Sequence, residues 1–400
     1  MLVCSNSSIS HAAVGRETGF DPNCSFLFSS HKETLRAEGV RHVLDVPSVD
    51  DLPEAVADYF RSRPVSGECK TVVGMLPFRR DRKPHLVEPL ALHRSTCSPD
   101  SLPRPSAAVM GRCTISEVPS RVQYRQMVEQ ALKMMGDSEP LRKVVLSRAL
   151  QLTAGTLINV SALIARLARD RHSTTFAVKL PGDDAGILLG ATPELLVQKR
   201  GNRFVSVPLA GSARRRVNSN EDKSVAEALL HSEKDRREHA SVVDSIVEAL
   251  APYCRHIRAA RIPTVMPTAT MWHLGTHIEG EIRDDSITSL HLAAALHPTA
   301  AVCGQPREIA AAAIEQLESF ERGFFTGAVG WCDSAGDGQW MVTIRCAEVH
   351  GNRARLYAGA GIVTGSDPEA EAAETSAKFQ TLLRAMGIDE TGRALDEAAA

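Results

Sequence analysis

The sequence is poor in aromatic side chains, in net charge and in long apolar runs. Phe, Trp and Tyr make up 4% of the 400 residues, so aliphatic side chains must provide most of the core packing. The 46 Lys and Arg residues nearly balance the 48 Asp and Glu residues. Without a basic excess the chain lacks the attraction that binds phosphate backbones, and we expect no nucleic-acid partner. No apolar run approaches the ~18 residues of a membrane-spanning helix, so we also expect no membrane partner.

Common metal, redox and nucleophile motifs are also missing. The nine cysteines are an odd number, and no two of them have the C-x-x-C spacing of zinc or redox sites. The sequence contains no P-loop, no G-x-S-x-G and no H-E-x-x-H motif. The first residues lack the basic start and apolar stretch of a secretory signal. These features predict a cytoplasmic globular protein with reduced cysteines, and its size favours an enzyme.

The distribution of structure signals along the chain predicts one large domain. Residues 1–24 are polar and are expected to be poorly ordered, and 391–400 are expected to form a tail. Length alone would suggest two or three domains, but no break interrupts the pattern after residue 121. We therefore predict a single catalytic domain over 25–390, with a less regular part at 25–120 and a sharply patterned part at 121–386. Within the former, residues 79–120 are predicted to form a surface excursion or a linker.

Apolar periodicity predicts more strands than a regular alternation of strands and helices would contain. Strands are expected near 26–28, 71–78, 143–148, 175–179, 186–189 and 355–358, and a hairpin at 327–332 and 340–349. Helices are expected near 124–135, 160–170, 306–319 and 369–386, together with one long helix over 222–250. This pattern favours an α+β fold over a doubly wound sheet.

Acidic residues stand at helical spacing on two of the predicted helices. Asp235 and Glu238 are three residues apart, and Glu371, Glu374 and Lys378 stand at i, i+3 and i+7. Carboxylates presented from two helices can hold Mg²⁺, a hard cation that prefers oxygen ligands. Solvated helix faces with ordinary ion pairs are the alternative, and spacing alone favours that alternative.

Isolated titratable residues occur in several apolar, strand-like settings. Lys143 opens the run KVVLSR, and Glu194 follows the segment GATP. Burial would disfavour the charged form of each, making the lysine a possible base and the carboxyl a possible acid, unless both reach the surface. His273 fits a structural histidine, whereas a buried Arg345 would need an anion from the protein or from a ligand.

Two glycine-containing segments are weaker signals. The glycines of Gly359-Ala360-Gly361 lie between a predicted strand and a helix, where backbone N–H groups could approach an anion, although a plain turn is the simpler explanation. Gly211 precedes the basic segment 212–216, which reads as a solvated loop. Taken separately, none of these sites identifies a reaction.

In order along the chain, these segments resemble the chorismate-utilising enzymes, and most closely the isochorismate synthases that supply catechol siderophore pathways. The resemblance spans about 121–386 and is thinner over 26–120, where only the FLF strand and the G-x-x-PF segment at 74–78 fit. The matching blocks are KVVLSR (143–148), GATPELL (190–196), PLAGSARR (208–215), SEKDRREH (232–239), WHLGTHIEG (272–280), HPTAAVCGQP (297–306), GFFTGAVGWCD (323–333), TIRCAEV (343–349), AGAGIV (358–363) and EAEAAETSAK (369–378).

The resemblance implies a fold, a reaction and a role for each matching residue. The fold would be that of the chorismate-utilising (ADC synthase-like) enzymes, with large antiparallel β-sheets packed as a sandwich and helices outside. Water would attack C2 of chorismate while the C4 hydroxyl leaves, giving isochorismate reversibly. Lys143 would be the general base and Glu194 the general acid. Mg²⁺ would bind Glu238 and Glu374, with Asp235 and Glu371 contributing through water. The substrate would contact Gly211, His273, Arg345, Gly359, Gly361 and Lys378.

Relatives with other products remain as alternatives. Aminating members of the family lack a lysine at the water-activating position, so Lys143 argues against them. Salicylate synthases keep this lysine and go on to eliminate pyruvate, but Ala301 and Val302 form a small apolar segment of the isochorismate synthase type. A non-catalytic chorismate-binding protein is a third possibility. The product's fate, as 2,3-dihydroxybenzoate, salicylate or menaquinone, is open, with siderophore supply favoured. No feature demands a protein partner, so a monomer is expected.

Overall fold

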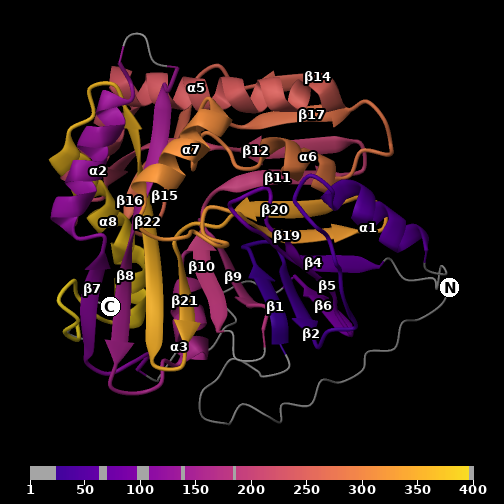
Figure 1. Cartoon of the computed structure of the whole chain (residues 1–400), viewed down its shortest axis with the longest axis horizontal. Coiled ribbons are helices and arrows are strands. Elements are labelled where there is room, and N and C mark those ends of the chain that lie inside the picture. The colour runs from indigo at the N-terminus through magenta and orange to yellow at the C-terminus, as the bar shows by residue number, and fades with distance from the viewer. Residues whose placement is uncertain (1–23, 63–69, 97–107, 137–139, 183–185, 396–400) are drawn as a thin grey trace.

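The computed structural model describes residues 24–62, 70–96, 108–136, 140–182 and 186–395. Two large antiparallel sheets and one small sheet form its framework, and helices cover the outside (Figure 1). This is the α+β class that the sequence pattern favoured and the sandwich of antiparallel sheets that the family resemblance implied. No helix in the described part of the chain is both long and apolar enough to cross a membrane.

The first sheet contains the strand that opens with Lys143. Its path runs in the order β18 (Gly304–Gln305), β8 (Lys143–Ala154), β22 (Arg353–Val363), β21 (Cys346–His350), β10 (Ile187–Thr192), β9 (Thr174–Lys179), β1 (Cys24–Ser29), β2 (Thr34–Glu38) and β6 (Ala91–Ser95), and β7 (Cys113–Val118) also pairs with β8. Strand β8 is buried over its first eight residues, as expected for an apolar run covered on both faces.

The second sheet contributes the other half of the sandwich, and the third sheet lies at its side. The second runs in the order β14 (Cys254–Ala259), β17 (Ile278–Ile282), β12 (Arg203–Val207), β11 (Leu195–Arg200), β20 (Gly338–Val342), β19 (Ala328–Asp333), β4 (Thr71–Leu76), β5 (His85–Glu88) and β3 (His42–Val43). The third consists of β13 (Leu209–Arg214), β16 (Met271–Gly275) and β15 (Thr264–Pro267).

A buried apolar cluster joins the two large sheets. Phe26, Phe28 and Phe176 of the first sheet pack in one cluster with Trp331 and Met341 of the second. Aromatic side chains therefore help to fill the space where the two pleated surfaces meet, and where a large side chain buries much area.

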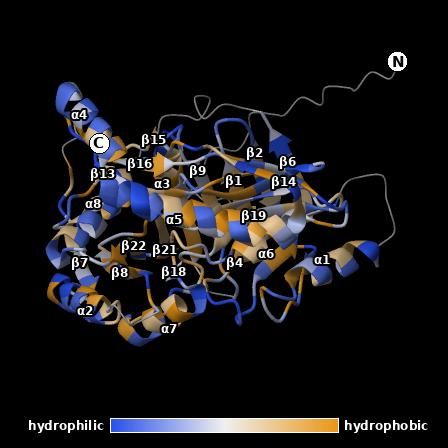
Figure 2. Ribbon diagram, turned by 90° about the horizontal axis from the view of Figure 1, so that it is seen from above, coloured by the Kyte–Doolittle hydropathy of each residue, from blue (hydrophilic) through white to orange (hydrophobic). Residues whose placement is uncertain are grey.

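Helices cover the outer faces of this sandwich (Figure 2). Clusters of buried residues join α1, α5 and α6 to the second sheet, α3 and α8 to the first sheet, and α2 and α7 to β8 and β22. The helices are α1 (Leu52–Arg61), α2 (Arg121–Lys133), α3 (Val160–Leu167), α4 (Ser219–His231), α5 (Glu233–Leu250), α6 (Ser289–Leu296), α7 (Arg307–Leu317) and α8 (Pro368–Met386), with a short 3-10 turn at Ala251–Tyr253.

Local sequence explains the ends of the two helices that carry the predicted acidic residues. Asp367 caps α8 by accepting a hydrogen bond from the backbone N–H of Ala370, and Pro368 occupies its first turn. Gly387 ends α8 in the left-handed conformation, at φ +77°. At the start of α5, the hydroxyl of Ser232 accepts a hydrogen bond from the N–H of Asp235.

The single helix predicted over 222–250 is wrong, because this same cap divides it. Ser232 adopts an extended conformation between α4 and α5, so the chain changes direction at that residue. The sequence does not show that Ser232 leaves the helical conformation, because the apolar stripe continues on both sides of it.

The regions predicted to be irregular contain more strand than expected. The described parts of 79–120 include β5, β6 and β7, and the segment read as a basic loop begins within β13. Gly359 and Gly361 lie inside β22 rather than in a turn after it. The predicted second arm of the hairpin is two strands, because β20 belongs to the second sheet and β21 to the first.

The limits of the predicted domain lie partly outside the described residues. Cys24 already belongs to β1, and the rest of the predicted disordered segment, 1–23, lies outside the described residues. Of the predicted tail, Leu395 donates a backbone hydrogen bond to Gly387, Ala394 forms an isolated bridge with Ile388, and 396–400 are outside. The single-domain organisation stays a prediction.

Candidate active site

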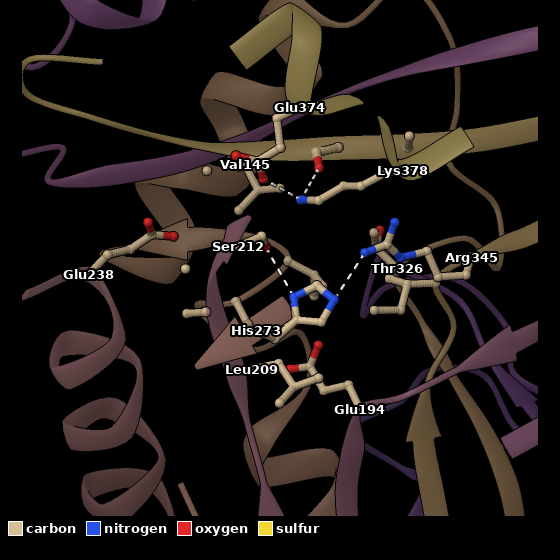
Figure 3. A pocket seen from close by; sticks show the side chains of 18 of the residues that line it. Val145, Glu194, Leu209, Ser212, Glu238, His273, Thr326, Arg345, Glu374 and Lys378 are labelled. Atoms are coloured by element: carbon tan, nitrogen blue, oxygen red, sulfur yellow. Dashed lines mark hydrogen bonds and ion pairs between the residues drawn. The ribbon is translucent and has the colours of Figure 1, made fainter. Parts of the chain in front are cut away.

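A pocket lies where the two large sheets, the small sheet and helices α5 and α8 meet (Figure 3). It holds a cavity of about 90 Å³, which exceeds the ~10–15 Å³ that one water requires. Eleven of the twelve predicted site residues line it: Glu194, Gly211, Asp235, Glu238, His273, Arg345, Gly359, Gly361, Glu371, Glu374 and Lys378. The twelfth, Lys143, is buried immediately beside Gly361 and contacts Glu238. The fold therefore brings together residues that are separated by up to 235 positions in the chain.

Two of these residues lie where the chain crosses from one large sheet to the other. Glu194 lies between β10 and β11, and Arg345 lies between β20 and β21. The crossings are adjacent, because the N–H of Val342 donates to the carbonyl of Glu194 at 3.0 Å and that of Ala191 donates to the carbonyl of Arg345 at 3.2 Å. Arg345 was expected inside a strand, but it occupies the connection at φ +52°, a costly conformation for a residue with a side chain.

The Glu194 carboxyl is buried in this junction, with 3% of its residue surface exposed. Burial raises its pKa to about 7, although the N–H of Leu209 and the cations Lys143, Lys378 and Arg345 act in the opposite direction. A substantial fraction of Glu194 therefore keeps its proton near neutral pH. A protonated carboxyl that faces a pocket can serve as a general acid.

Next to Glu194, His273 links the small sheet to Arg345. Its ring lies between the hydroxyl of Ser212, 3.1 Å from Nδ1, and Arg345 Nη2, 3.3 Å from Nε2. Burial, aided by the charges of Arg345 and Lys378, lowers the pKa of His273 well below its usual value. The ring is therefore neutral, with Nε2 accepting from the guanidinium and Nδ1–H donating to Ser212.

The Arg345 guanidinium has unused donor capacity inside the pocket. Burial lowers its pKa, to about 10, so the group still carries its charge at neutral pH. Its Nη1 is buried and has no hydrogen-bond partner among the described residues. A buried cation with an unused donor strongly favours an anionic ligand, and a carboxylate matches the guanidinium fork.

Lys143 and Glu238 form a buried ion pair at the other side of the pocket. Lys143 Nζ lies 2.8 Å from Glu238 Oε1, and the two side chains are 3% and 13% exposed. Burial alone would raise the pKa of Glu238, but the ammonium of Lys143 outweighs burial and lowers it. Glu238 is therefore an anion at neutral pH, held next to the lysine.

A glycine makes this pair possible. A Cβ atom on Gly361 would lie 2.7 Å from Glu238 Oε1 and 3.1 Å from Lys143 Cε, so the ends of both side chains would have to shift. Gly211, at φ +79°, has a similar role in β13, where an added Cβ would lie 3.0 Å from the Cβ of Asp235, which is also on α5. Both glycines therefore matter because they let side chains of α5 approach the backbone closely, and not because they form a turn.

The predicted acidic residues of α5 and α8 line the same pocket, and all of them except Asp235, which accepts from the hydroxyl of Ser232, are paired with lysines. Lys378 Nζ lies 2.6 Å from Glu374 and donates to the carbonyl of Gly359 at 2.7 Å. Lys234, which the sequence analysis did not single out, lies 3.4 Å from Glu371. Burial and the neighbouring carboxylate of Glu374 raise the pKa of Glu371.

The oxygen atoms of these carboxylates are suitable ligands for a divalent cation, although the side chains are not arranged as a complete coordination site. Within the described residues, no group of three or more His, Cys, Asp and Glu side chains is placed to hold a metal. Glu238 and Glu374 nevertheless line one cavity with hard oxygen donors. Mg²⁺ typically takes one or two protein carboxylates and completes its shell with water and substrate oxygens.

Several residues of the pocket carried no recognisable signal in the sequence. Thr326, at φ +59°, is the second residue other than glycine with positive φ in the described part of the chain, and both such residues line the pocket. Apolar side chains complete one wall: Val145, Val302, Phe325, Ile344 and Tyr357. Apart from Val302, which the sequence analysis named, these residues are indistinguishable in sequence from ordinary core positions, so only the fold reveals them.

Comparison with known proteins identifies the family. Residues 65–387 match the family model described as "Chorismate binding enzyme". The isochorismate synthase DhbC of Bacillus subtilis is 44% identical over 382 residues, covering 92% of this chain and 95% of that protein. The vibriobactin-specific isochorismate synthase of Vibrio cholerae is 40% identical, with 91% and 92% covered.

A solved structure agrees with this result. The crystal structure of DhbC from Bacillus anthracis, described as a 2,3-dihydroxybenzoate-specific isochorismate synthase, superposes with a TM-score of 0.86 at 42% identity. The comparison covers 92% of this chain and 98% of that one. The resemblance that was drawn from ordered sequence blocks is therefore confirmed, and the chain belongs to the chorismate-binding enzyme family.

Proposed function

We propose that the chain is a Mg²⁺-dependent isochorismate synthase that reversibly converts chorismate to isochorismate. The observation that carries this proposal is the pairing, in one pocket, of a buried carboxyl with a pKa of about 7 and a buried guanidinium with an unused donor. The first suits an acid for a leaving hydroxyl, and the second suits a substrate carboxylate. Relatives at 40–44% identity bear the same activity in their names.

Binding of the substrate dianion would use the cations of the pocket. Arg345 would donate its free Nη1 to one substrate carboxylate, and neutral His273 would hold the guanidinium in orientation. Gly359 and Gly361 would let the substrate approach the backbone of β22, and Gly211 would do the same on β13. Lys378 would add a second positive charge. Such preorganised charges cost little reorganisation during the reaction.

Lys143 would act as the base that takes a proton from the attacking water. Only an uncharged lysine amine can accept that proton. This requires another cation to balance the charge of the adjacent Glu238 carboxylate. The water oxygen then bonds to C2, the ring double bonds shift, and the bond from C4 to its hydroxyl breaks. Glu194 donates its proton to the departing hydroxyl, so one water enters, one leaves, and substrate and product are isomers.

Glu238 and Glu374 would hold Mg²⁺, with Asp235 and Glu371 contributing through water. When bound, the cation would supply positive charge for the ring carboxylate of the substrate. The lysines now paired with these carboxylates would be released for other partners. Burial and neighbouring carboxylates raise the pKa values of Asp235 and Glu371, and a cation beside them would act in the opposite direction.

We further propose that the enzyme supplies a siderophore pathway from the cytoplasm and acts as a monomer. Two of its relatives are named for vibriobactin and for 2,3-dihydroxybenzoate, which is the basis for the first part. The small apolar wall that includes Ala301 and Val302 supports a product that is released as isochorismate rather than cleaved further.

Incubation of the purified protein with chorismate and Mg²⁺, followed by chromatographic separation of the products, tests this function. We expect isochorismate as the product, at an equilibrium reached from either side, and no turnover when a chelator removes the metal. Salicylate with an equal amount of pyruvate would instead identify a salicylate synthase. Chorismate binding without turnover, measured by calorimetry, would identify a non-catalytic binding protein.

A further inference from the structure

A buried ion pair that the proposed mechanism does not use lies directly behind the pocket. Arg322 and Glu318 follow α7, and their side chains are only 2% and 1% exposed. Arg322 Nε donates to Glu318 Oε2 at 2.8 Å and Nη2 donates to Oε1 at 2.5 Å. Two parallel hydrogen bonds of this kind fix the orientation of the guanidinium as well as its position.

The remaining donors of Arg322 reach three separate segments of chain. Nη2 donates to the carbonyl of Val145 in β8 at 2.6 Å, and Nη1 donates to the carbonyl of Val302 at 2.9 Å. Nη1 also contacts the hydroxyl of Thr326 at 3.2 Å. One guanidinium thus ties together a strand, the segment before β18 and the segment before β19.

Glu318 adds a fourth connection. Its Oε1 accepts a hydrogen bond of 2.7 Å from the backbone N–H of Ser147, two residues beyond Val145 in β8. The carboxylate therefore holds the same strand that the guanidinium holds through Val145. Arg322 and Glu318 are therefore both required to fix β8 relative to the segments that contain Val302 and Thr326.

The three residues held by Arg322 all line the pocket. Figure 3 labels Val145 and Thr326 among the residues that line it, and Val302 belongs to its apolar wall. Thr326 is held at φ +59°, a conformation that persists only where surrounding contacts enforce it. Its N–H donates to the carbonyl of Thr343 at 2.7 Å, which links this wall to the crossing segment that carries Arg345.

Aromatic rings restrict the guanidinium further. Its central carbon lies 4.5 Å from the ring centre of Phe78 and 5.8 Å from that of Phe325, which also lines the pocket. A lysine at this position would keep the charge but could not supply the planar fork that meets Glu318 and two carbonyls at once. The site is therefore specific for arginine.

We propose that Arg322, oriented by Glu318, is a positioning residue that sets the shape of the apolar wall of the active site. It does so by fixing Val145, Val302 and Thr326 relative to one another, and so determines how the substrate ring is seated. This inference rests on the proposed function for its assay. Small displacements of such a wall are costly, because a misplacement of about 1 Å can lower kcat/KM by roughly 10²-fold.

Substitution at both members of the pair tests the proposal. In R322K and E318Q we expect kcat/KM for chorismate to fall by roughly 10–100-fold, mainly through a higher KM. The Mg²⁺ concentration for half-maximal activity should stay within about twofold of the wild-type value, because the hydrogen bonds of the pair go to β8 and to the segments before β18 and β19, not to the helices that carry the proposed metal ligands. The wild-type protein is assayed alongside. Its turnover of chorismate tests the proposed function independently of the variants.

A double variant guards against loss of folding. R322M/E318L removes both charges, so no lone charge stays buried, although the N–H of Ser147 and the carbonyls of Val145 and Val302 lose this partner and should lower the melting temperature. We expect it to melt cooperatively and to show the same increase in KM. K199M is the control, because the buried Lys199 forms an ion pair of 2.9 Å with the partly exposed Asp337 and does not line the pocket.

The control should retain the wild-type KM even if its melting temperature falls. A KM within twofold of the wild-type value in folded R322K and in the double variant would overturn the proposal. An equal increase in KM in K199M would also overturn it, because the effect would then reflect a general loss of stability.

Discussion

Replacement of Glu194 by glutamine should make the protein more stable at alkaline pH while it removes most of the activity. Glu194 is 3% exposed and its pKa is raised from 4.5 to about 7 by burial. Between these two values the folded protein keeps a proton that the unfolded chain has lost. The free energy of unfolding therefore falls as pH rises through this range and is constant above it.

The size of this effect follows from the shift. At 1.36 kcal/mol per pH unit, the ionised carboxyl costs about 3 kcal/mol of stability at pH 8 and nothing below about pH 4.5. Glutamine resembles the protonated carboxyl in size and cannot ionise. We therefore expect E194Q and the wild type to have similar stability at pH 5, and E194Q to be more stable by about 3 kcal/mol at pH 8.

Activity should change in the opposite direction. Loss of the proton donor should reduce kcat by roughly 10²–10⁴-fold. In the wild type, kcat/KM should decrease about tenfold per pH unit above 7, as Glu194 loses its proton. Urea unfolding at pH 5 and pH 8, combined with chorismate turnover, measures both effects. Equal or lower stability of E194Q at pH 8, or near-normal turnover, would refute the assignment of Glu194 as a buried acid.

Three further substitutions test other parts of the site. Lys143→Met should lower turnover by roughly 10²–10⁴-fold through loss of the base. It should also reduce the free energy of unfolding measured in urea by about 3–5 kcal/mol, because Glu238 is left buried and unpaired. Normal turnover would exclude this lysine as the base. Arg345→Met should raise the chorismate KM by roughly 10–100-fold through loss of a charged hydrogen bond, and an unchanged KM would exclude it from substrate binding. Gly361→Ala should raise the Mg²⁺ concentration for half-maximal activity about tenfold, because the new Cβ would lie 2.7 Å from Glu238. Gly111→Ala, whose Cβ would meet no atom closer than 3.8 Å, is its control, and equal behaviour of the two would contradict the close-approach argument.

The sequence predicted the candidate site better than it predicted the paths between elements. Ordered blocks such as KVVLSR and SEKDRREH preserve residue types and spacing, so Lys143 and Glu238 could be named before any geometry was known. Their contact across 95 residues could not be predicted, because periodicity describes only local structure. The pairing depends on how α5 packs against the sheets.

Local patterns failed where tertiary context overrides them. Ser232 caps a new helix although the apolar stripe runs through it, and Arg345 occupies a strained connection although its neighbours have the composition of a strand. The Arg322–Glu318 pair gave no signal either. An arginine four residues after a glutamate is typical of an exposed helix face, and only the structure reveals its burial.

The origin of the oxygen in the product tests the central claim most directly. Chorismate should be converted in ¹⁸O-labelled water with Mg²⁺ present, and isochorismate should be isolated at low conversion for mass spectrometry. We predict one ¹⁸O atom per isochorismate, located at C2, and loss of this product in the Lys143→Met variant. Isochorismate without label would mean that the hydroxyl migrates within the substrate, and would contradict an attack by water activated at Lys143.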